Sequence, residues 1–187
     1  MNLPEGPLFI LQGAFMDKDR GAIDAVKAMK FIDSGTLLLI GAGEEFDQAA
    51  VLRKELGLES RIIMLPKQTY NELRHYTANA DIGLSLDKGY YFNYLYSLPN
   101  KLFDYVHAGI PVLASDLPIV GKVVRDYEFG EVMENYTPEN IAAGINSIIA
   151  KGKGAYAAGI SKVQTEFHWH KESDVIRKVF VREGWLK

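Results

Sequence analysis

Short apolar runs alternate with longer amphipathic stretches along almost the whole of this 187-residue chain. The runs have the length of strands, and they cover residues 8–13, 36–41, 61–65, 81–86, 111–115 and 130–133. The stretches between them have helical periodicity, most clearly at residues 19–32, 45–57, 69–79, 99–108 and 138–151. Strands that are apolar on both faces and separated by helices form parallel βαβ units. The pattern therefore predicts an α/β fold, a doubly wound parallel sheet with helices on both faces.

The chain is predicted to be one domain, residues 1–187, with the sheet and its helices in residues 8–151. The rest, 152–187, is predicted to form two C-terminal helices, near 153–167 and 170–183. No internal repeat, low-complexity segment or linker rich in Pro, Gly and Ser divides the sequence. The first strand begins almost at the first residue, as if another segment preceded it.

Charge and composition argue against several classes of protein. The net charge is -3 and the pI is about 5.8, which argues against a nucleic-acid-binding surface. With no cysteine, the chain forms neither a disulfide framework nor a zinc-thiolate site. The longest apolar run, 37–40, is too short for a transmembrane segment, and the N-terminal residues lack the pattern of a secretory signal. A cytoplasmic location is the expectation.

The loop after the first strand carries a glycine and an arginine of interest. Ligands of open parallel sheets bind at the carboxyl ends of the strands. Gly13 allows a close turn there, and Arg20 can reach a phosphate from the start of the next helix. An alternative is a plain turn in which Asp17 or Asp19 caps the helix. The same two aspartates match a weak Asp-x-Asp metal pattern, but capping explains them better.

Two further loops lie at the same edge of the predicted sheet. The Gly-Ala-Gly-Glu-Glu turn at 41–45 could cradle a phosphate, but it lacks the third glycine of a dinucleotide site. A tight strand-to-helix turn is the favoured interpretation. In the loop 65–69, Pro66 stiffens the chain and Thr69 can cap the following helix.

The helix 99–108 has the most informative polar side. Pro99 suits its first position, with Ser97 or Leu98 as the cap, and the free amides of the first turn form an anion site. Within an arc of roughly 120°, the helix presents Asn100, Lys101, Asp104, His107 and Ala108. This spacing suits a nucleotide diphosphate whose ribose diol is held by a carboxylate. The alternative is a solvated face with a Lys101–Asp104 pair.

These residues resemble the donor-binding half of glycosyltransferases with the GT-B fold, of the retaining family 4 type. The resemblance covers residues 8–182 and depends most on Ser-Leu-Pro-Asn-Lys-Leu-Phe-Asp-Tyr-Val-His-Ala-Gly-Ile-Pro-Val-Leu-Ala-Ser at 97–115. Weaker matches are QGAF, LLLIGAGEE, RIIMLP, NELRHYTANADIGLSL and FHW. The implied fold is the Rossmann-like C-terminal half of a GT-B enzyme, with the N-terminal, acceptor-binding half expected to be absent.

The resemblance also implies a nucleotide-sugar site. Its expected residues are Gly13, Arg20, Met64, Pro66, Lys67, Ser97, Asn100, Lys101 and Asp104. Asp104 would bind the ribose, and the backbone of 64–67 would contact the base. Arg20 and Lys101 would have the catalytic role of stabilising the leaving diphosphate, with no metal ion or other cofactor. Tyr96 stands where a glutamate usually contacts the sugar, and Ala14 where an arginine is usual. Smaller departures are Asp104 at a position that usually has glutamate and Arg20 at one that usually has lysine.

The implied function is sugar transfer from a nucleotide sugar to an acceptor with retention, in polysaccharide or glycoconjugate biosynthesis. The isolated chain is expected to bind a UDP- or GDP-sugar without transferring it. Its acceptor is unknown, and any peripheral membrane association would be through the absent half. One alternative is half of a GT-B nucleotide-sugar epimerase. Another is a non-catalytic nucleotide-binding module, which Tyr96 and Ala14 favour. A flavodoxin-like or receiver domain is disfavoured, because strand 8–13 ends without acidic residues.

Aromatic and histidine residues remain outside this scheme. The aromatic run Tyr90–Tyr96 is expected to border the cleft, where it would stack on sugar or base or meet the missing half. A mobile loop that packs on itself is the alternative. Trp169 and Trp185 resemble part of the crossover that docks on the absent half. His168 and His170 lack an evident third ligand, so a metal site there is disfavoured.

Overall fold

The computed structural model describes residues 6–186 as a parallel six-stranded sheet in the order β3-β2-β1-β4-β5-β6. The strands are β1 (Leu8–Gly13), β2 (Thr36–Gly41), β3 (Ile62–Pro66), β4 (Ile82–Ser85), β5 (Val112–Ser115) and β6 (Gly130–Met133). Every neighbouring pair is parallel. This is the order of a doubly wound Rossmann-like sheet, so the predicted fold class is confirmed.

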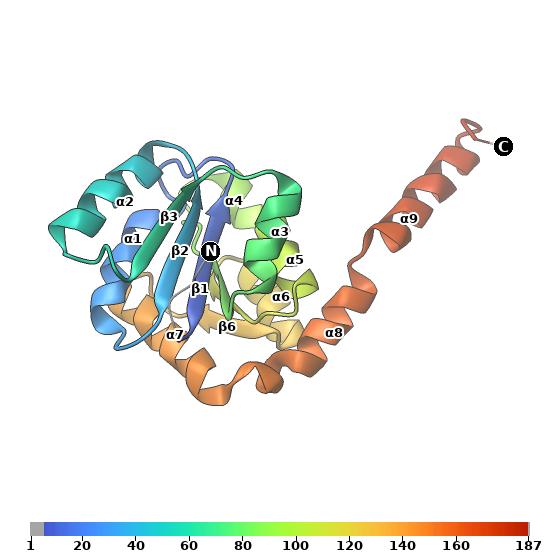
Figure 1. The fold of residues 1–187 in the computed structure, drawn as a ribbon. Coiled ribbons are helices and arrows are strands. Elements are labelled where there is room, and N and C mark those ends of the chain that lie inside the picture. Colours follow the sequence, from blue (N-terminus) through green and yellow to red (C-terminus); the bar gives the residue numbers. More distant parts are fainter. Residues whose placement is uncertain (1–5, 187) are drawn as a thin grey trace.

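Helices cover both faces of the sheet (Figure 1). They are α1 (Ala22–Ala28), α2 (Glu44–Glu55), α3 (Tyr70–Ala78), α4 (Phe92–Tyr96), α5 (Asn100–His107), α6 (Val120–Tyr127), α7 (Pro138–Lys151), α8 (Ala157–Glu166) and α9 (Trp169–Arg182). Two 3-10 turns, η1 (Met29–Phe31) and η2 (Lys153–Tyr156), extend α1 and precede α8. Helix α1 packs between α2 and α7, whereas α5 contacts α3 and α8.

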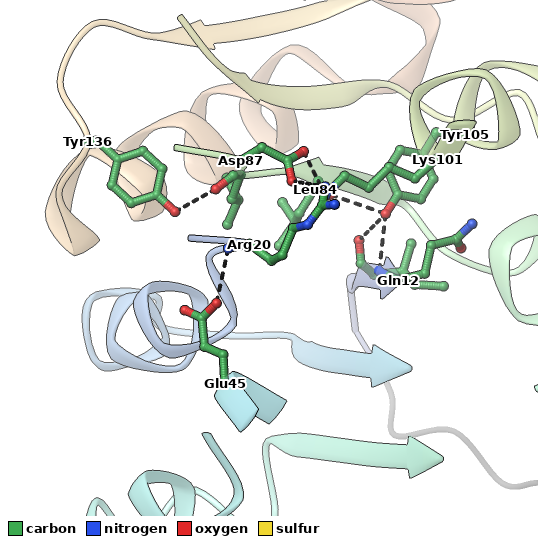
Figure 2. A network of polar contacts seen from close by, with 10 residues as sticks. Gln12, Arg20, Glu45, Leu84, Asp87, Lys101, Tyr105 and Tyr136 are labelled. Atoms are coloured by element: carbon green, nitrogen blue, oxygen red, sulfur yellow. Dashed lines mark hydrogen bonds and ion pairs between the residues drawn. The ribbon is translucent and has the colours of Figure 1, made fainter. Parts of the chain in front are cut away.

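Tyr105 anchors α5 to the middle of the sheet. Its ring lies directly over Gly83 of β4, and it is fully buried. Its hydroxyl lies 3.1 Å from the carbonyl oxygen of Leu84 and 3.3 Å from that of Ile10, and accepts the backbone N–H of Gln12. One side chain thus joins α5 to the ends of β1 and β4 (Figure 2).

Two helices were not predicted from the sequence. Helix α4 lies inside the aromatic run and has no amphipathic repeat that would identify it. Helix α6 contains Gly121 and several valines, which lower helix propensity. Burial of Val120 and Val124 overrides that propensity.

The first helix begins later than residue 19, where its pattern placed it. The residue before α1 is Gly21, with a φ of 85°, and as a glycine it has no side chain that could cap the helix. The interpretation of Asp17 or Asp19 as its cap is therefore wrong. Gly21 is required because a Cβ there would lie 2.5 Å from Leu86 and from the Tyr136 hydroxyl.

The two predicted C-terminal helices are confirmed. The first, near 153–167, corresponds to η2 and α8, and the second, near 170–183, corresponds to α9. Helix α9 extends away from the sheet (Figure 1) and has no buried residue. Its exposed apolar side chains include Trp169, Ile176, Val179 and Phe180. Of the helices in residues 6–186, none has both the length and the apolar character needed to cross a membrane.

Candidate functional site

A crevice opens between β1 and β4, where the sheet order reverses. The chain continues from β1 toward one edge of the sheet and from β4 toward the other, so the loops after these strands diverge. An open pocket of about 400 Å³ lies there. Its wall includes Gly13, Ala14, Arg20, Tyr94, Ser97, Asn100 and Lys101. The residues come from the loop after β1, from α4 and from the start of α5.

Two cations meet one buried carboxylate at this crevice. Arg20 Nη1 lies 2.8 Å from Asp87 Oδ1, and Lys101 Nζ lies 2.9 Å from Asp87 Oδ2. The exposed fractions of the side chains are 33% for Arg20, 10% for Lys101 and 6% for Asp87. Figure 2 shows the three side chains facing one another from separate segments. The arrangement concentrates positive charge beside the pocket.

The Arg20 guanidinium is also held by an aromatic ring. Its central carbon lies 4.4 Å from the ring centroid of Tyr94 in α4, within the range of a cation–π contact. Tyr94 lines the same pocket. The aromatic run therefore borders the cleft, as predicted, although Tyr90, Tyr91, Phe92 and Tyr96 are largely exposed.

One helix start near the crevice, that of α1, is already occupied by a carboxylate. Glu45, which is buried, accepts the backbone N–H of Arg20 (3.0 Å) and of Ile23 (3.3 Å) at the start of α1. Burial raises the pKa of Glu45 above its ordinary value, although these hydrogen bonds oppose the shift. At α5, by contrast, no side chain of the described residues caps the first turn. The N–H of Leu102 already donates to the carbonyl oxygen of Pro99 (3.0 Å), so the amides that could bind an anion are those of Asn100 and Lys101.

Pro99 is the residue before α5, not its first helical residue as predicted. The prediction of Ser97 or Leu98 as the cap is therefore wrong, and Ser97 is instead the C-terminal cap residue of α4. The turn 41–45 packs on the loop after β1, where the N–H of Glu45 donates to the carbonyl oxygen of Met16. This contact supports the tight-turn interpretation of that segment.

A second pocket of about 900 Å³ shares part of the same wall. Its lining includes Gln12, Asn100, Lys101, Asp104 and His107. Gln12 Nε2 donates to Asp104 Oδ2 (3.0 Å), and Gln12 Oε1 accepts from Thr77 (2.8 Å). Burial raises the pKa of Asp104, against the opposing effect of the Gln12 bond. The carboxylate is thereby held in a fixed direction at the pocket.

The family model described as Glycosyl transferases group 1 matches residues 1–161. The chain belongs to this family. Comparison with curated proteins gives no match.

Solved structures of glycosyltransferases share the fold. Sucrose-phosphate synthase from Thermosynechococcus elongatus has a TM-score of 0.77 at 22% identity, over 97% of this chain and 47% of that one. The C-terminal domain of the group 1 protein LpcC from Francisella tularensis scores 0.68 at 18% identity, over 87% and 86%. HepE from Anabaena, solved with UDP and glucose, scores 0.81 at 14% identity, over 94% and 48%. The fold is that of a GT-B C-terminal domain, and this chain spans about half the length of the first and third proteins.

In this group 1 domain, the structure brings together six of the predicted site residues. They line the two adjoining pockets and are Gly13, Arg20, Ser97, Asn100, Lys101 and Asp104. Of the residues described around these pockets, none comes from the segment 64–67. Met64 pairs with Leu39 inside the sheet, and Pro66 ends the edge strand β3. Lys67 Nζ lies 5.4 Å from the Phe15 ring, so this loop does approach the loop after β1.

The sequence did not identify Asp87 and Gln12 as members of the site, and it named Tyr94 only as part of the aromatic run. Asp87 directly follows the apolar run 81–86. A polar residue at the carboxyl end of a predicted strand is a candidate for a binding site, so the sequence did contain a signal for Asp87. Gln12 lies inside an apolar strand, and the sequence pattern does not show that its side chain is buried, with 2% exposed.

His168 has a structural role, since its Nδ1 accepts the N–H of Lys171 at the start of α9. Within residues 6–186, no cluster of three His, Asp or Glu side chains could hold a metal ion.

Asp87→Asn should lower the free energy of unfolding by about 3 kcal/mol at neutral pH, because Lys101 stays buried without a carboxylate. Burial by itself raises the pKa of Asp87, but Lys101 and Arg20 outweigh it and hold the pKa below its ordinary value. The stabilisation is therefore complete above the unfolded pKa, about 3.9, and lost as pH falls through the folded pKa. Urea unfolding at several pH values should show the gap between wild type and variant closing in acid. A gap that remains open below the folded pKa of Asp87 would contradict this account.

Proposed function

We propose that the chain is the nucleotide-sugar-binding domain of a glycosyltransferase that transfers a sugar to an acceptor with retention of configuration. The observation that carries this proposal is the convergence of Arg20 and Lys101 at the crevice, beside the uncapped start of α5. Membership of the group 1 family supports it. A role in polysaccharide or glycoconjugate biosynthesis, in the cytoplasm, is part of the proposal.

The two pockets suggest where each part of the nucleotide-sugar donor would bind. The diphosphate would lie against Arg20, Lys101, Ser97 and Asn100, where amide dipoles and cations attract it. The ribose would bind Asp104, whose carboxylate is oriented by Gln12. The base would lie toward the loop after β3, near residues 64–67.

Transfer breaks the bond between the anomeric carbon and the phosphate oxygen, and the electron pair stays with the diphosphate. The leaving group therefore gains negative charge, and groups placed where charge develops lower the barrier. Arg20 and Lys101 would supply this stabilisation as catalytic residues, so we propose that no metal ion is needed. The acceptor hydroxyl loses its proton in the same overall reaction.

The acceptor-binding residues are proposed to belong to a second half. The chain spans about half the length of sucrose-phosphate synthase and of HepE. The exposed apolar side chains of α9 would suit contact with such a half. The chain alone is accordingly expected to bind the nucleotide without transferring the sugar.

Asp104→Ala should weaken nucleotide binding about tenfold, because it removes a hydrogen-bonded anionic partner of the ribose. Calorimetric titration with UDP and then GDP, with and without magnesium, measures this. HepE was solved with UDP, so UDP is the first probe. Saturable binding of one nucleotide that is indifferent to magnesium is the expected result for the wild type.

A matched control is Asp126→Ala, which removes an exposed carboxylate on α6 and should leave the affinity unchanged. Failure of both nucleotides to saturate the wild type at millimolar concentration would contradict a donor site formed by this domain. Equal affinity in wild type and Asp104→Ala would contradict the ribose assignment alone.

Ala14 favours a second candidate, a nucleotide-binding module without transferase activity. Ala14 lines both pockets where the family usually has an arginine, so one expected cation is missing. Such a module would bind UDP or GDP, yet the full-length protein would release no nucleotide from a sugar donor in the presence of acceptor. Release of the nucleotide, followed by chromatography, distinguishes the two candidates.

A further inference from the structure

Asp87 forms the ion pairs of both proposed diphosphate-binding cations. In the described part of the chain, neither Arg20 nor Lys101 has another carboxylate within ion-pair distance. The three side chains come from the loop before α1, the segment after β4 and the first turn of α5. A single buried carboxylate thus ties together segments that are distant in the sequence.

The carboxylate does not compete with a ligand for the cleft. Arg20 and Lys101 line the pocket at the start of α5, whereas Asp87 contributes to a neighbouring pocket with Lys88 and Tyr136. A guanidinium has five N–H donors and an ammonium has three. Each cation directs one polar atom at Asp87 and keeps further donors for an anion in the cleft.

We propose that Asp87 is a positioning residue for the diphosphate of the nucleotide sugar, holding the Arg20 guanidinium and the Lys101 ammonium charged and together before the nucleotide binds. This inference rests on the proposed function. It adds a residue that acts on the donor through two others and does not itself touch it.

Burial explains why the cations need this partner. Lys101 is almost fully buried, and burial lowers its pKa below the ordinary value, against the opposing effect of Asp87. The charged and titratable groups around it are Asp87, Arg20 and Glu45, with Asp104 and His107 on its own helix. Only Asp87 is in ion-pair contact with Lys101 within the described residues.

The sign of the effect follows from counting charges. With Asp87 present, two cations and one carboxylate leave a net charge of +1 beside the cleft. Without it, a neutral Lys101 and a charged Arg20 also leave +1, so attraction for the diphosphate does not increase. However, without the Asp87 carboxylate the side chains of Arg20 and Lys101 are no longer held in place beside the cleft. Binding should therefore weaken, and a diphosphate that binds must restore the proton of Lys101.

The test is calorimetric titration of wild type and Asp87→Asn with whichever of UDP and GDP the wild type binds. Titrations near neutral pH in two buffers of different ionisation enthalpy measure the protons taken up. The variant should bind about tenfold more weakly and take up more protons than the wild type, approaching one per site. Loss of structure alone would lower the affinity but would not change proton uptake.

Asp116→Asn is the matched control. Asp116 follows β5 as Asp87 follows β4, and it also pairs with an arginine, Arg125. Its side chain is 42% exposed, so its removal leaves no buried unpaired charge. Affinity and proton uptake should both equal those of the wild type.

If Asp87→Asn does not fold, a second pair of variants tests whether Asp87 positions Arg20 for nucleotide binding. Lys101→Met and the double variant Asp87→Asn/Lys101→Met leave no unpaired buried ammonium. The double variant has one more net positive charge beside the cleft than Lys101→Met, so weaker binding in the double variant can come only from the lost position of Arg20. Weaker binding is the expected result.

The outcomes separate this inference from the proposed function. Wild-type affinity and proton uptake in Asp87→Asn would overturn the inference and leave the nucleotide site standing. The same holds if the double variant binds as tightly as Lys101→Met or more tightly. A wild type that binds neither UDP nor GDP would overturn the proposed function and this inference with it.

Discussion

Gly83→Ala should destabilise the protein by about 3 kcal/mol, near the upper end of the usual cost of overpacking a core. A Cβ on Gly83 would lie 2.2 Å from Tyr105 Cγ and 2.3 Å from Cδ2. Tyr105 cannot move away easily, because it is fully buried and its hydroxyl is held between β1 and β4. Relief would require α5 to shift away from the sheet. Urea unfolding of wild type and variant measures the loss.

Gly154→Ala is the matched control for this substitution. A Cβ on Gly154 would meet nothing within 4 Å, so the stability should change little. Because α5 carries Lys101 and Asp104, Gly83→Ala should also weaken nucleotide binding under conditions in which the variant remains folded. A variant as stable as the wild type would show that Tyr105 is not tightly packed against β4.

Arg20→Gln should weaken binding of the nucleotide by roughly 30-fold, the equivalent of about 2 kcal/mol for a lost charge-assisted contact. The side chain is only partly buried, so the variant should fold. Glutamine retains a polar group of similar reach but lacks the charge and the planar fork that binds phosphate oxygens. Titration with UDP and GDP measures the change.

The effect on transfer should exceed the effect on binding. Negative charge on the diphosphate increases as the sugar departs, so a missing cation costs more in the transition state than in the bound state. In the full-length enzyme, kcat should therefore fall as well as the affinity. Arg125→Gln, which removes an arginine paired with Asp116 on the surface, is the control. An unchanged kcat in Arg20→Gln would exclude Arg20 from the chemistry.

Local periodicity was enough to predict the sheet and most helices. Strands such as Leu8–Gly13 and Thr36–Gly41 are apolar on both faces because helices cover both faces. The same local reasoning located the polar side of α5, since Lys101 and Asp104 are one turn apart. It failed at α6, where burial of Val120 and Val124 outweighs a poor helix propensity.

The remainder of the site depends on contacts between distant segments. Asp87 meets Arg20 across 67 residues of sequence, and Gln12 meets Asp104 across 92. Both contacts exist because β1 and β4 are neighbours in the sheet, and no periodic pattern states which strands are neighbours. Likewise, Glu45 occupies the start of α1 only because α2 packs against α1.

The sequence by itself determined the class of fold, the helix that faces the crevice and the polar residues that it carries. These features depend on residues a few positions apart, and apolar burial repeats with the period of the element. The tertiary structure alone decided that Arg20 and Lys101 share Asp87, that Tyr94 lies against Arg20 and that Glu45 occupies the start of α1. Strand order and packing produce these contacts, which are therefore properties of the whole fold.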